Sequence, residues 1–261
     1  PKGAQLAVTV PAEDDAWPLA ALARVSDRLI FMAYDQHWEG GTPGPIAGQA
    51  WFVDQVAKAI RTIGRDKLVV ALGSYAYDWH GDDTDALSIE DAWLAAHDSQ
   101  APVSFDRNAG NAGFAYDEGD QRHTIWMLDA ATSWNQLVAL KHLGIDDVAL
   151  WRLGSEDPGF WSDLTAWRTG GKPDLSSPRA LLNADVEGSG EILRITATPT
   201  PGVRQVTHNR NGIITDEHYA ALPTPFVVRR TGAQNPKLLA LTFDDGPDPT
   251  WTPKILKELE Q

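Results

Sequence analysis

The segment RLIFMAYDQHW, residues 28–38, joins an apolar run to a cluster of polar and aromatic side chains. Residues 28–33 are mostly apolar, as in a strand that is buried on both faces of a parallel sheet. Tyr34, Asp35 and Trp38 follow and supply a hydroxyl, a carboxylate and an indole. In parallel α/β folds, the binding residues lie at the carboxyl ends of the strands. The segment therefore predicts an inner strand that ends in a candidate binding site.

Short apolar runs alternate with helical stretches on both sides of this segment. We expect further strands at 5–10, 67–72 and 147–151. We expect helices at 18–25, 50–63, 88–97 and 133–143, with Ser88 and Asp91 spaced as in a capping box. This alternation indicates βα units and an α/β fold with a parallel sheet. Four units are half of a (β/α)8 TIM barrel, and an open half exposes two sheet edges. We therefore expect residues 1–168 to be the C-terminal half of a barrel that begins upstream.

Three other regions depart from the βα pattern. Residues 102–128 predict a small two-stranded β insertion that turns at 117–120. Residues 169–236 contain frequent Pro, Gly and Ser, and two predicted strands at 191–199 and 225–230 indicate a small β connector. Residues 237–261 then predict the first strand and helix of a second barrel-type domain, with the helix at 252–259.

The composition favours a neutral ligand. The formal net charge is −14, whereas nucleic acids and anionic membranes bind basic surfaces. We therefore predict no nucleic-acid partner, and no apolar run approaches the roughly 20 residues that span a bilayer. Eleven tryptophans could stack on sugar rings, although most tryptophans belong to cores or interfaces. The chain has no cysteine, which excludes disulfide and thiolate chemistry.

Polar and aromatic residues also follow two other predicted strands. GSYAYDW, residues 73–79, follows the strand at 67–72, and WRLGSED, residues 151–157, begins where the strand at 147–151 ends. The strand ends of a barrel meet at one rim. Together, these residues predict a pocket whose polar groups and aromatic planes suit a polyhydroxylated ring.

These segments resemble family 18 glycoside hydrolases, the chitinase-like enzymes, over about residues 5–165. FMAYD resembles the family's Met-x-Tyr-Asp signature, and Trp151 stands where the family places an indole beneath the sugar that is cleaved. The resemblance implies that Tyr34 and Asp35 contact the N-acetyl group of that sugar. The substrate-binding residues that we expect are Met32, Tyr34, Asp35, Tyr77, Trp126 and Trp151. The implied partner is a polysaccharide of β-linked N-acetylglucosamine.

The family's general acid is the Glu of a D-x-x-D-x-D-x-E motif, and the 261 residues contain no such motif. Because Asp35 cannot replace an acid on a neighbouring strand, we expect the chain alone not to hydrolyse sugars. A non-catalytic, lectin-like barrel that holds polymer for an adjoining enzyme is the main alternative. A third alternative is that this half-barrel is purely a scaffold. A fourth is an unrelated barrel in which Tyr34 and Asp35 form a structural hydrogen-bonding pair.

LALTFDDGPDPTWTPKIL, residues 239–256, resembles the first motif of NodB-type polysaccharide deacetylases. The resemblance implies that Asp244 is a catalytic base and that Asp245 binds a divalent metal, zinc being expected, which activates water. That family takes its other metal ligands from a His-x-x-x-His motif, and the chain has none. We therefore expect this chain alone to retain no metal, because one carboxylate does not hold a catalytic ion. An ordinary acidic turn is the alternative reading.

We therefore predict a piece of a longer, modular carbohydrate-active enzyme that continues on both sides of these residues. Glycoside hydrolysis and deacetylation would act on the same sugar polymer. We expect an extracytoplasmic location, at the cell surface or in the periplasm, with a membrane anchor elsewhere in the protein as one option. Asp82, Asp83 and Asp85 lack the spacing of an EF-hand loop, so we interpret them as a solvated turn.

Overall fold

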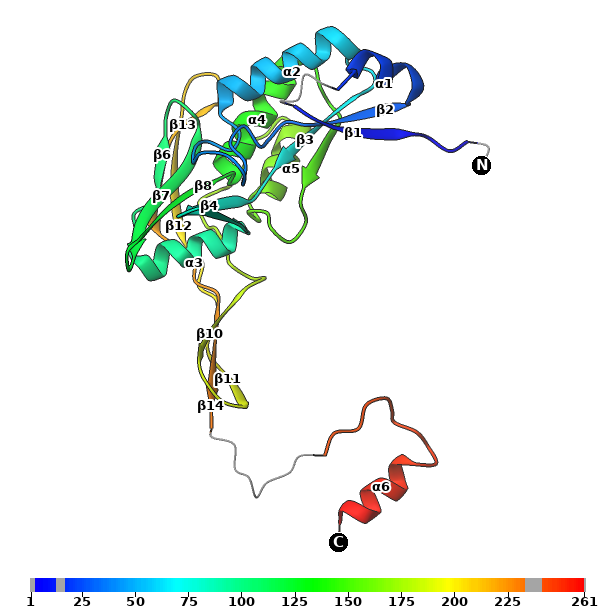
Figure 1. Ribbon diagram of the computed structural model, residues 1–261, viewed down its shortest axis with the longest axis vertical. Coiled ribbons are helices and arrows are strands. Elements are labelled where there is room, and N and C mark those ends of the chain that lie inside the picture. Colours follow the sequence, from blue (N-terminus) through cyan, green and yellow to red (C-terminus); the bar gives the residue numbers. More distant parts are fainter. Residues whose placement is uncertain (1–2, 13–16, 233–240, 261) are drawn as a thin grey trace.

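The computed structural model describes residues 3–12, 17–232 and 241–260. The larger part of the molecule consists of residues 3–12 and 17–169. A four-stranded parallel sheet lies within it (Figure 1). Its strands, in the order β1-β2-β3-β9, are β1 (Ala7–Pro11), β2 (Arg28–Met32), β3 (Leu68–Gly73) and β9 (Val148–Trp151). The four strands predicted from the apolar runs are therefore confirmed, in one sheet.

Four helices pack against this sheet and bury its apolar side chains. They are α1 (Leu19–Val25), α2 (Gln49–Ile63), α4 (Ala130–Leu143) and α5 (Phe160–Thr169). Phe52 on α2, Leu137 on α4 and Phe160 on α5 share one buried core with Val70 of β3. Asp129 caps α4, since its carboxylate accepts a hydrogen bond from the Thr132 amide, and the helix therefore starts earlier than predicted. The sequence reading did not single out α5.

The insertion is larger than the predicted pair of strands. Five strands form it, in the order β5-β4-β8-β7-β6, and α3 (Ile89–Ser99) packs on it. The strands are β4 (Ala76–His80), β5 (Asp83–Leu87), β6 (Ser104–Asp106), β7 (Asn111–Glu118) and β8 (Gln121–Met127). The predicted turn between β7 and β8 and the capping box of α3 are confirmed. The sequence did not predict β4 and β5; β4 pairs with the distant β8.

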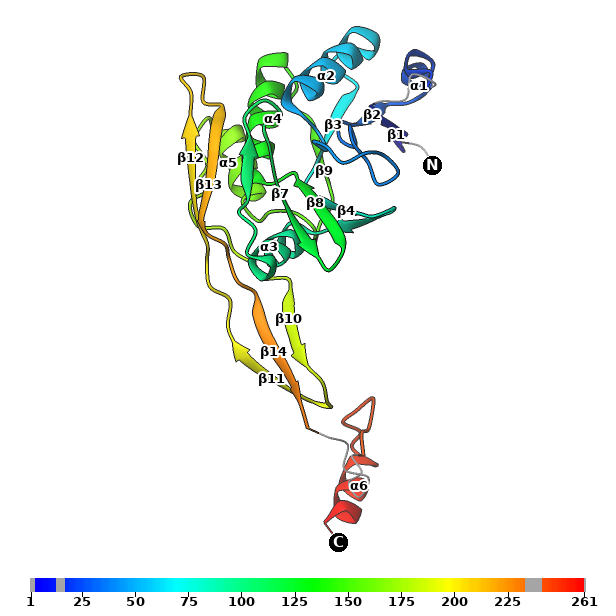
Figure 2. The ribbon, with the colours of Figure 1, turned by 60° about the vertical axis from the view of Figure 1, so that its left-hand side comes forward.

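The described residues of the predicted connector, 169–232, contain two separate sheets (Figure 2). The hairpin of β12 (Val203–His208) and β13 (Ile214–Ala221) packs against the larger part, where Ile214 exchanges backbone hydrogen bonds with the Asn135 side chain at 2.7 and 2.8 Å. The second sheet has the order β10-β14-β11, with β10 (Ala184–Gly188), β11 (Ile192–Ala197) and β14 (Phe226–Thr231). The two predicted connector strands are β11 and β14. Packing therefore continues across residue 168, and the domain division stays a prediction.

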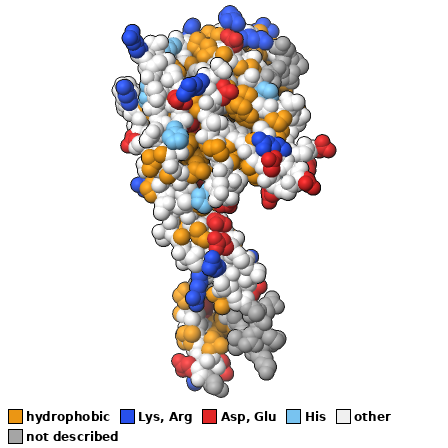
Figure 3. Space-filling view, turned by 90° about the vertical axis from the view of Figure 1, so that its left-hand side faces the viewer, with side chains coloured by type: hydrophobic (Ala, Val, Ile, Leu, Met, Phe, Trp, Pro, Cys, Tyr) orange, Lys and Arg blue, Asp and Glu red, His pale blue; other side chains and the backbone are white. Residues whose placement is uncertain are grey.

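The β10-β14-β11 sheet extends away from the larger part, and Figure 3 shows hydrophobic side chains exposed on it. Val186, Leu193 and Ile195 are each more than half exposed. The sheet is tied to the insertion by Glu90 of α3, which is 3% exposed. Its carboxylate accepts hydrogen bonds from the amides of Leu181, Leu182 and Asn183 at 2.8 to 2.9 Å.

Replacing Glu90 with alanine should release the segment that leads into β10. Three amides would lose a charged acceptor, and each such bond contributes about 1.5–3 kcal/mol. We expect the amides of 181–183 to exchange with deuterium at least about tenfold faster. Glu191→Ala, an exposed change in the bend between β10 and β11, is the control. Unchanged exchange in the Glu90 variant would contradict the anchoring role.

The C-terminal part contains the predicted helix, α6 (Thr252–Leu259). The predicted strand before it lies partly in 233–240, outside the described residues. Residues 241–244 are not a strand in the structure, which is a correction. A strand needs a hydrogen-bonded neighbour, and residues 241–244 pair with none of the described strands. No helix within the described ranges has the length and apolar character of a membrane span.

Candidate functional site

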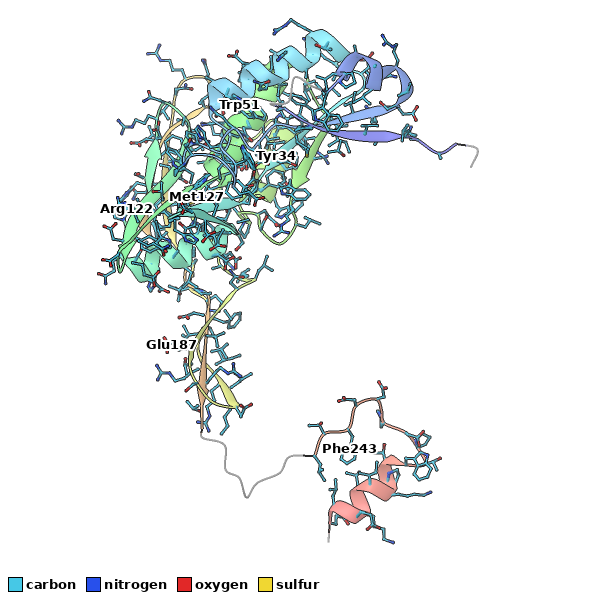
Figure 4. All side chains as sticks on the ribbon, in the orientation of Figure 1. Tyr34, Trp51, Arg122, Met127, Glu187 and Phe243 are labelled. Carbon is cyan, nitrogen blue, oxygen red and sulfur yellow. The ribbon has the colours of Figure 1, made fainter. Side chains whose placement is uncertain are left out.

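A cavity of about 330 Å³ lies at the carboxyl ends of β2, β3 and β9. Figure 4 labels Tyr34, which follows β2, together with Trp51 on α2 and Met127 on the insertion. The cavity is lined by Met32, Tyr34, Asp35, Glu39, Tyr75, Tyr77, Ala86, Leu87, Trp151, Arg152 and Ser155. Three strand ends and the β4-β5 pair thus bring acids, hydroxyls and one indole together.

Asp35 is the hydrogen-bonded centre of this cavity. The hydroxyl of Tyr77 donates to its Oδ1 at 3.2 Å, and the hydroxyl of Tyr75 donates to the same oxygen. Its backbone has a φ of 65°, the left-handed region that Asp adopts more readily than most residues. The backbone therefore turns at Asp35, and the carboxylate points toward Tyr75 and Tyr77.

The environment of Asp35 raises its pKa. Burial is the largest cause, and the nearby Glu39 charge acts in the same direction. The hydrogen bonds from Tyr75 and Tyr77 oppose this shift, since they stabilise the ionised carboxylate. Asp35 can therefore exchange a proton at a higher pH than an exposed aspartate.

A row of aromatic rings extends from Tyr34 along the insertion. Ring centres are 6.0 Å apart for Tyr34 and Tyr75, 5.2 Å for Tyr75 and Tyr77, and 5.4 Å for Tyr77 and Trp79, all edge-on. Neighbouring aromatic rings favour this edge-to-face arrangement, because the edge of one ring is positive and the face of the other is negative. Burial, and next the Asp35 charge, raise the pKa of Tyr34, Tyr75 and Tyr77. The three hydroxyls thus stay protonated and can donate hydrogen bonds.

Trp151 forms the open side of the cavity. Its side chain is 51% exposed at the end of β9, where Gly73 of β3 is its strand partner. The segment after it is held by Ser74, whose amide donates to the Trp151 carbonyl at 2.7 Å, and by Ser155, whose Oγ donates to the Ser74 carbonyl at 2.8 Å. The indole is therefore accessible while its backbone is fixed.

The structure brings together five of the six predicted binding residues. Met32, Tyr34, Asp35, Tyr77 and Trp151 line the cavity. Trp126 does not line it; it stands opposite Tyr77 on β8 and packs beside Gly113. Tyr75, Glu39 and Arg152 line the cavity although the sequence reading did not select them. The alternation in GSYAYDW was the available signal for Tyr75, which shares a face with Tyr77.

Replacing Tyr75 with phenylalanine should raise the pKa of Asp35 further. The change removes a hydrogen bond that favours the ionised carboxylate and keeps the ring that fills the core. Carboxyl-carbon NMR of Asp35 across a pH series measures the shift. Tyr116→Phe, a change on the distant β7, should leave the Asp35 titration as it is. A lower Asp35 pKa in the Tyr75 variant would contradict this assignment.

Asp244 and Asp245 are both exposed in the C-terminal part. Asp245 has a φ of 61°, and the turn after it is held by Asp248, whose Oδ1 accepts from the amides of Thr250 and Trp251 at 2.8 and 2.7 Å. Across the part of the chain that the structure describes, no three His, Cys, Asp or Glu side chains are grouped to hold a metal ion. The residues present therefore do not by themselves fit the expected zinc ion.

Comparisons with known proteins show which proteins the chain is similar to. The chain is 26% identical over 171 residues to the uncharacterized glycosylase YvbX of Bacillus subtilis, which covers 60% of this chain and 49% of that protein. It is 25% identical over 154 residues to a cortical fragment-lytic enzyme of the same species, covering 56% and 36%. The chain thus spans half or less of the length of these relatives. No family model matches it.

Solved structures that resemble the chain come from proteins of similar kinds. A chitinase from Chromobacterium violaceum has a TM-score of 0.59 and 28% identity, covering 64% of this chain and 56% of that one. The spore cortex-lytic enzyme SleL of Bacillus cereus has a TM-score of 0.57 and 25% identity, covering 63% and 41%. The chain is therefore a homologue of glycosylases and chitinase-like proteins, with an α/β fold like that of the chitinase-like barrels.

A further relative is a deacetylase, and it matches this chain over a short stretch only. A peptidoglycan-N-acetylglucosamine deacetylase of Bacillus cereus is 51% identical to this chain over 39 residues, which is 15% of this chain and 18% of that protein. This stretch is too short to place the whole chain among deacetylases.

Proposed function

We propose that the cavity at the ends of β2, β3 and β9 binds a β-linked N-acetylglucosamine polymer of the chitin or peptidoglycan type. One observation carries the proposal: a partly buried carboxylate, that of Asp35, is held by two tyrosine hydroxyls beside the half-exposed indole of Trp151. An acetamido group offers an N–H that a carboxylate can accept from and a carbonyl that a tyrosine hydroxyl can donate to. The indole offers a flat apolar face for the ring.

In a longer protein, we propose that this site serves glycoside hydrolysis. Cleavage assisted by the acetamido oxygen requires that Asp35 and Tyr34 orient that group toward the anomeric carbon, while an acid protonates the leaving oxygen. The two acids that line the cavity are Asp35 and the exposed Glu39. Asp35 already accepts two hydrogen bonds, which suits positioning of the acetamido group better than proton donation. The chain alone would therefore bind sugar without cleaving it.

Calorimetric titration of the purified chain with N-acetylglucosamine and glucose tetramers, both β-1,4-linked, tests the proposal. We expect binding of the first and much weaker binding of the second, because glucose lacks the acetamido group that Asp35 and Tyr34 would hold. Equal affinities would overturn the role of these two residues. Release of new reducing ends by the chain alone would overturn the expectation that the acid lies elsewhere.

A lectin-like role is the second candidate. The observation that favours it is the pair of hydrogen bonds from Tyr75 and Tyr77, which hold the Asp35 carboxyl group in place as a recognition element. This candidate predicts sugar binding and no hydrolysis even when the flanking parts of the protein are present. Hydrolysis by such a longer protein would exclude it.

For residues 237–261 we propose the start of a polysaccharide deacetylase, with Asp244 as base and Asp245 as one metal ligand. The 51% identity over 39 residues supports this assignment. The other ligands would have to come from outside these residues, so acetate release and zinc retention are expected only in a longer protein. An extracytoplasmic location, where such polymers occur, follows from this proposal and not from a separate observation.

A further inference from the structure

A second cavity, of about 660 Å³, lies between the loop after β2 and the two turns of the insertion. It is lined by Glu39, Gly40, Gly41, Thr42, Pro43, Trp79, Gly81, Asp82, Asp83, Thr84, Asp120, Gln121, Arg122 and Thr124. Thr84 Oγ1 donates to the Glu39 carbonyl at 2.8 Å, which holds the loop against the β4-β5 turn. Figure 4 shows Arg122 near the outer end of the insertion. The walls of this cavity therefore come from three separate segments.

This cavity adjoins the sugar site. Glu39 lines both cavities. Tyr77, which lines the first, and Trp79, which lines the second, lie on the same face of β4 with ring centres 5.4 Å apart. A polymer that occupies the first cavity and continues along β4 would enter the second.

Trp79 gives the second cavity an aromatic wall with an unused donor. Its side chain is 5% exposed, and its Nε1 has no hydrogen-bond partner among the described residues. A buried indole N–H usually has a partner. A ligand hydroxyl that reaches this wall would satisfy it.

The charge of the second cavity is strongly acidic. Four carboxylates line it, those of Glu39, Asp82, Asp83 and Asp120, against one guanidinium. That guanidinium, of Arg122, already pairs with Asp117 at 3.0 Å. Asp82, Asp83 and Asp120 are exposed; Asp82 and Asp120 lie in turns and Asp83 begins β5. The cavity therefore favours a cation over the neutral ring that suits the first cavity.

We propose that this second cavity is a subsite for a protonated amino sugar, so that the chain prefers a partly de-N-acetylated polymer over a fully acetylated one. The inference rests on the proposed sugar site and adds the chemical class of the neighbouring residue of the polymer. An acetylated sugar is placed at Asp35 and Trp151. A glucosamine, whose free amine carries a positive charge, is placed among Asp82, Asp83 and Asp120. Neutral acetamido groups gain nothing from these carboxylates.

Affinities for two tetrasaccharides test the inference: fully acetylated N-acetylglucosamine tetramer, and a tetramer that mixes acetylated and free-amine residues. The variant replaces Asp82, Asp83 and Asp120 with asparagine. The control replaces three exposed aspartates far from the cavity, Asp66, Asp98 and Asp146, with asparagine and so changes the net charge equally. We expect the variant to bind the mixed tetramer about tenfold more weakly, with the acetylated tetramer unaffected, since exposed charge pairs each contribute a fraction of a kcal/mol to about 1 kcal/mol.

Raised salt should reduce the preference of the unmodified chain for the mixed tetramer, because exposed charges are screened. Equal loss in the variant and the control would overturn the subsite, since it would reflect net charge alone. No preference for the mixed tetramer in the unmodified chain would also overturn it. Failure of the acetylated tetramer to bind any form would instead contradict the sugar site itself, which separates the two proposals.

Discussion

Replacing Arg204 with methionine is expected to lower the free energy of unfolding by about 3–5 kcal/mol. Arg204 of β12 is 2% exposed and donates from Nη1 to Asp157 Oδ2 at 2.6 Å and to the Tyr219 hydroxyl at 3.1 Å. Its Nε donates to the Leu175 carbonyl at 2.8 Å. Methionine keeps much of the volume but removes a cation that faces several buried acids.

The acids around Arg204 make this loss severe. Asp129, Asp157 and Asp163 are 0% exposed, and Glu217 is 6% exposed. Asp157 also accepts from the Ala130 and Gly159 amides, and so links α4, α5 and the hairpin through one side chain. Without the guanidinium, an ionised Asp157 would stay buried without a countercharge, which costs far more than the pair contributes when intact.

Urea denaturation measures the change, and Arg229→Met is the matched control. Arg229 pairs with Glu187 at 2.7 Å on the exposed β10-β14-β11 sheet, with side chains 56% and 42% exposed. A solvated pair contributes about 0–1 kcal/mol. Similar losses in both variants would show that Arg204 does not hold the hairpin onto the larger part.

The same cluster predicts a pH dependence. Burial raises the pKa of Asp163, with the Asp157 charge adding to the shift, and burial raises that of Glu217, with the Asp129 charge adding. At low pH both acids are protonated in the folded and unfolded states. As the pH rises, the unfolded chain releases these protons first, so stability falls until the folded acids also ionise. Glu217→Gln should reduce this fall.

The second large effect is expected from Trp151→Ala, which should weaken binding of the N-acetylglucosamine tetramer by about 30-fold or more. Trp151 supplies the open wall of the cavity beside Asp35. Truncation of a central aromatic anchor typically costs about 2 kcal/mol of binding energy or more, which is about 30-fold in the dissociation constant. Because the indole is 51% exposed, its removal leaves the core in place.

Trp251→Ala is the matched control, since Trp251 is 62% exposed and precedes α6, away from the cavity. Calorimetric titration gives both affinities, and thermal unfolding checks that each variant folds. An unchanged affinity in the Trp151 variant would favour the scaffold reading, in which the strand ends bind no sugar.

Much of the site followed from the sequence because its residues stand directly after apolar strands. Tyr34 and Asp35 follow β2, and Trp151 ends β9, so strand polarity alone predicted that they meet. Trp126 lies outside the cavity, because β8, which carries it, pairs with β4, and this pairing of distant segments has no local signal. Tyr75 could have been selected, since it shares the alternation of GSYAYDW with Tyr77.

The buried charge cluster could not be predicted at all. Asp157 precedes Arg204 by 47 residues, and Glu217 stands on the other strand of the Arg204 hairpin. Each of the three alone reads as an ordinary surface charge. They are buried only because the β12-β13 hairpin packs against α4 and α5. The sequence predicted only a connector at 169–236, because Pro, Gly and Ser are frequent there. It gave no indication that the β12-β13 hairpin packs against the preceding helices.

The amino-acid sequence alone predicts the four parallel strands, their polar ends, the capping box of α3 and the helix α6, because apolar periodicity, strand polarity and capping are local properties of neighbouring residues. The folded structure is needed to see which side chains share a cavity, which acidic residues line the cavity of Trp79, and which charges are buried. These features depend on pairing and packing between distant segments, and such contacts leave no spacing in the chain.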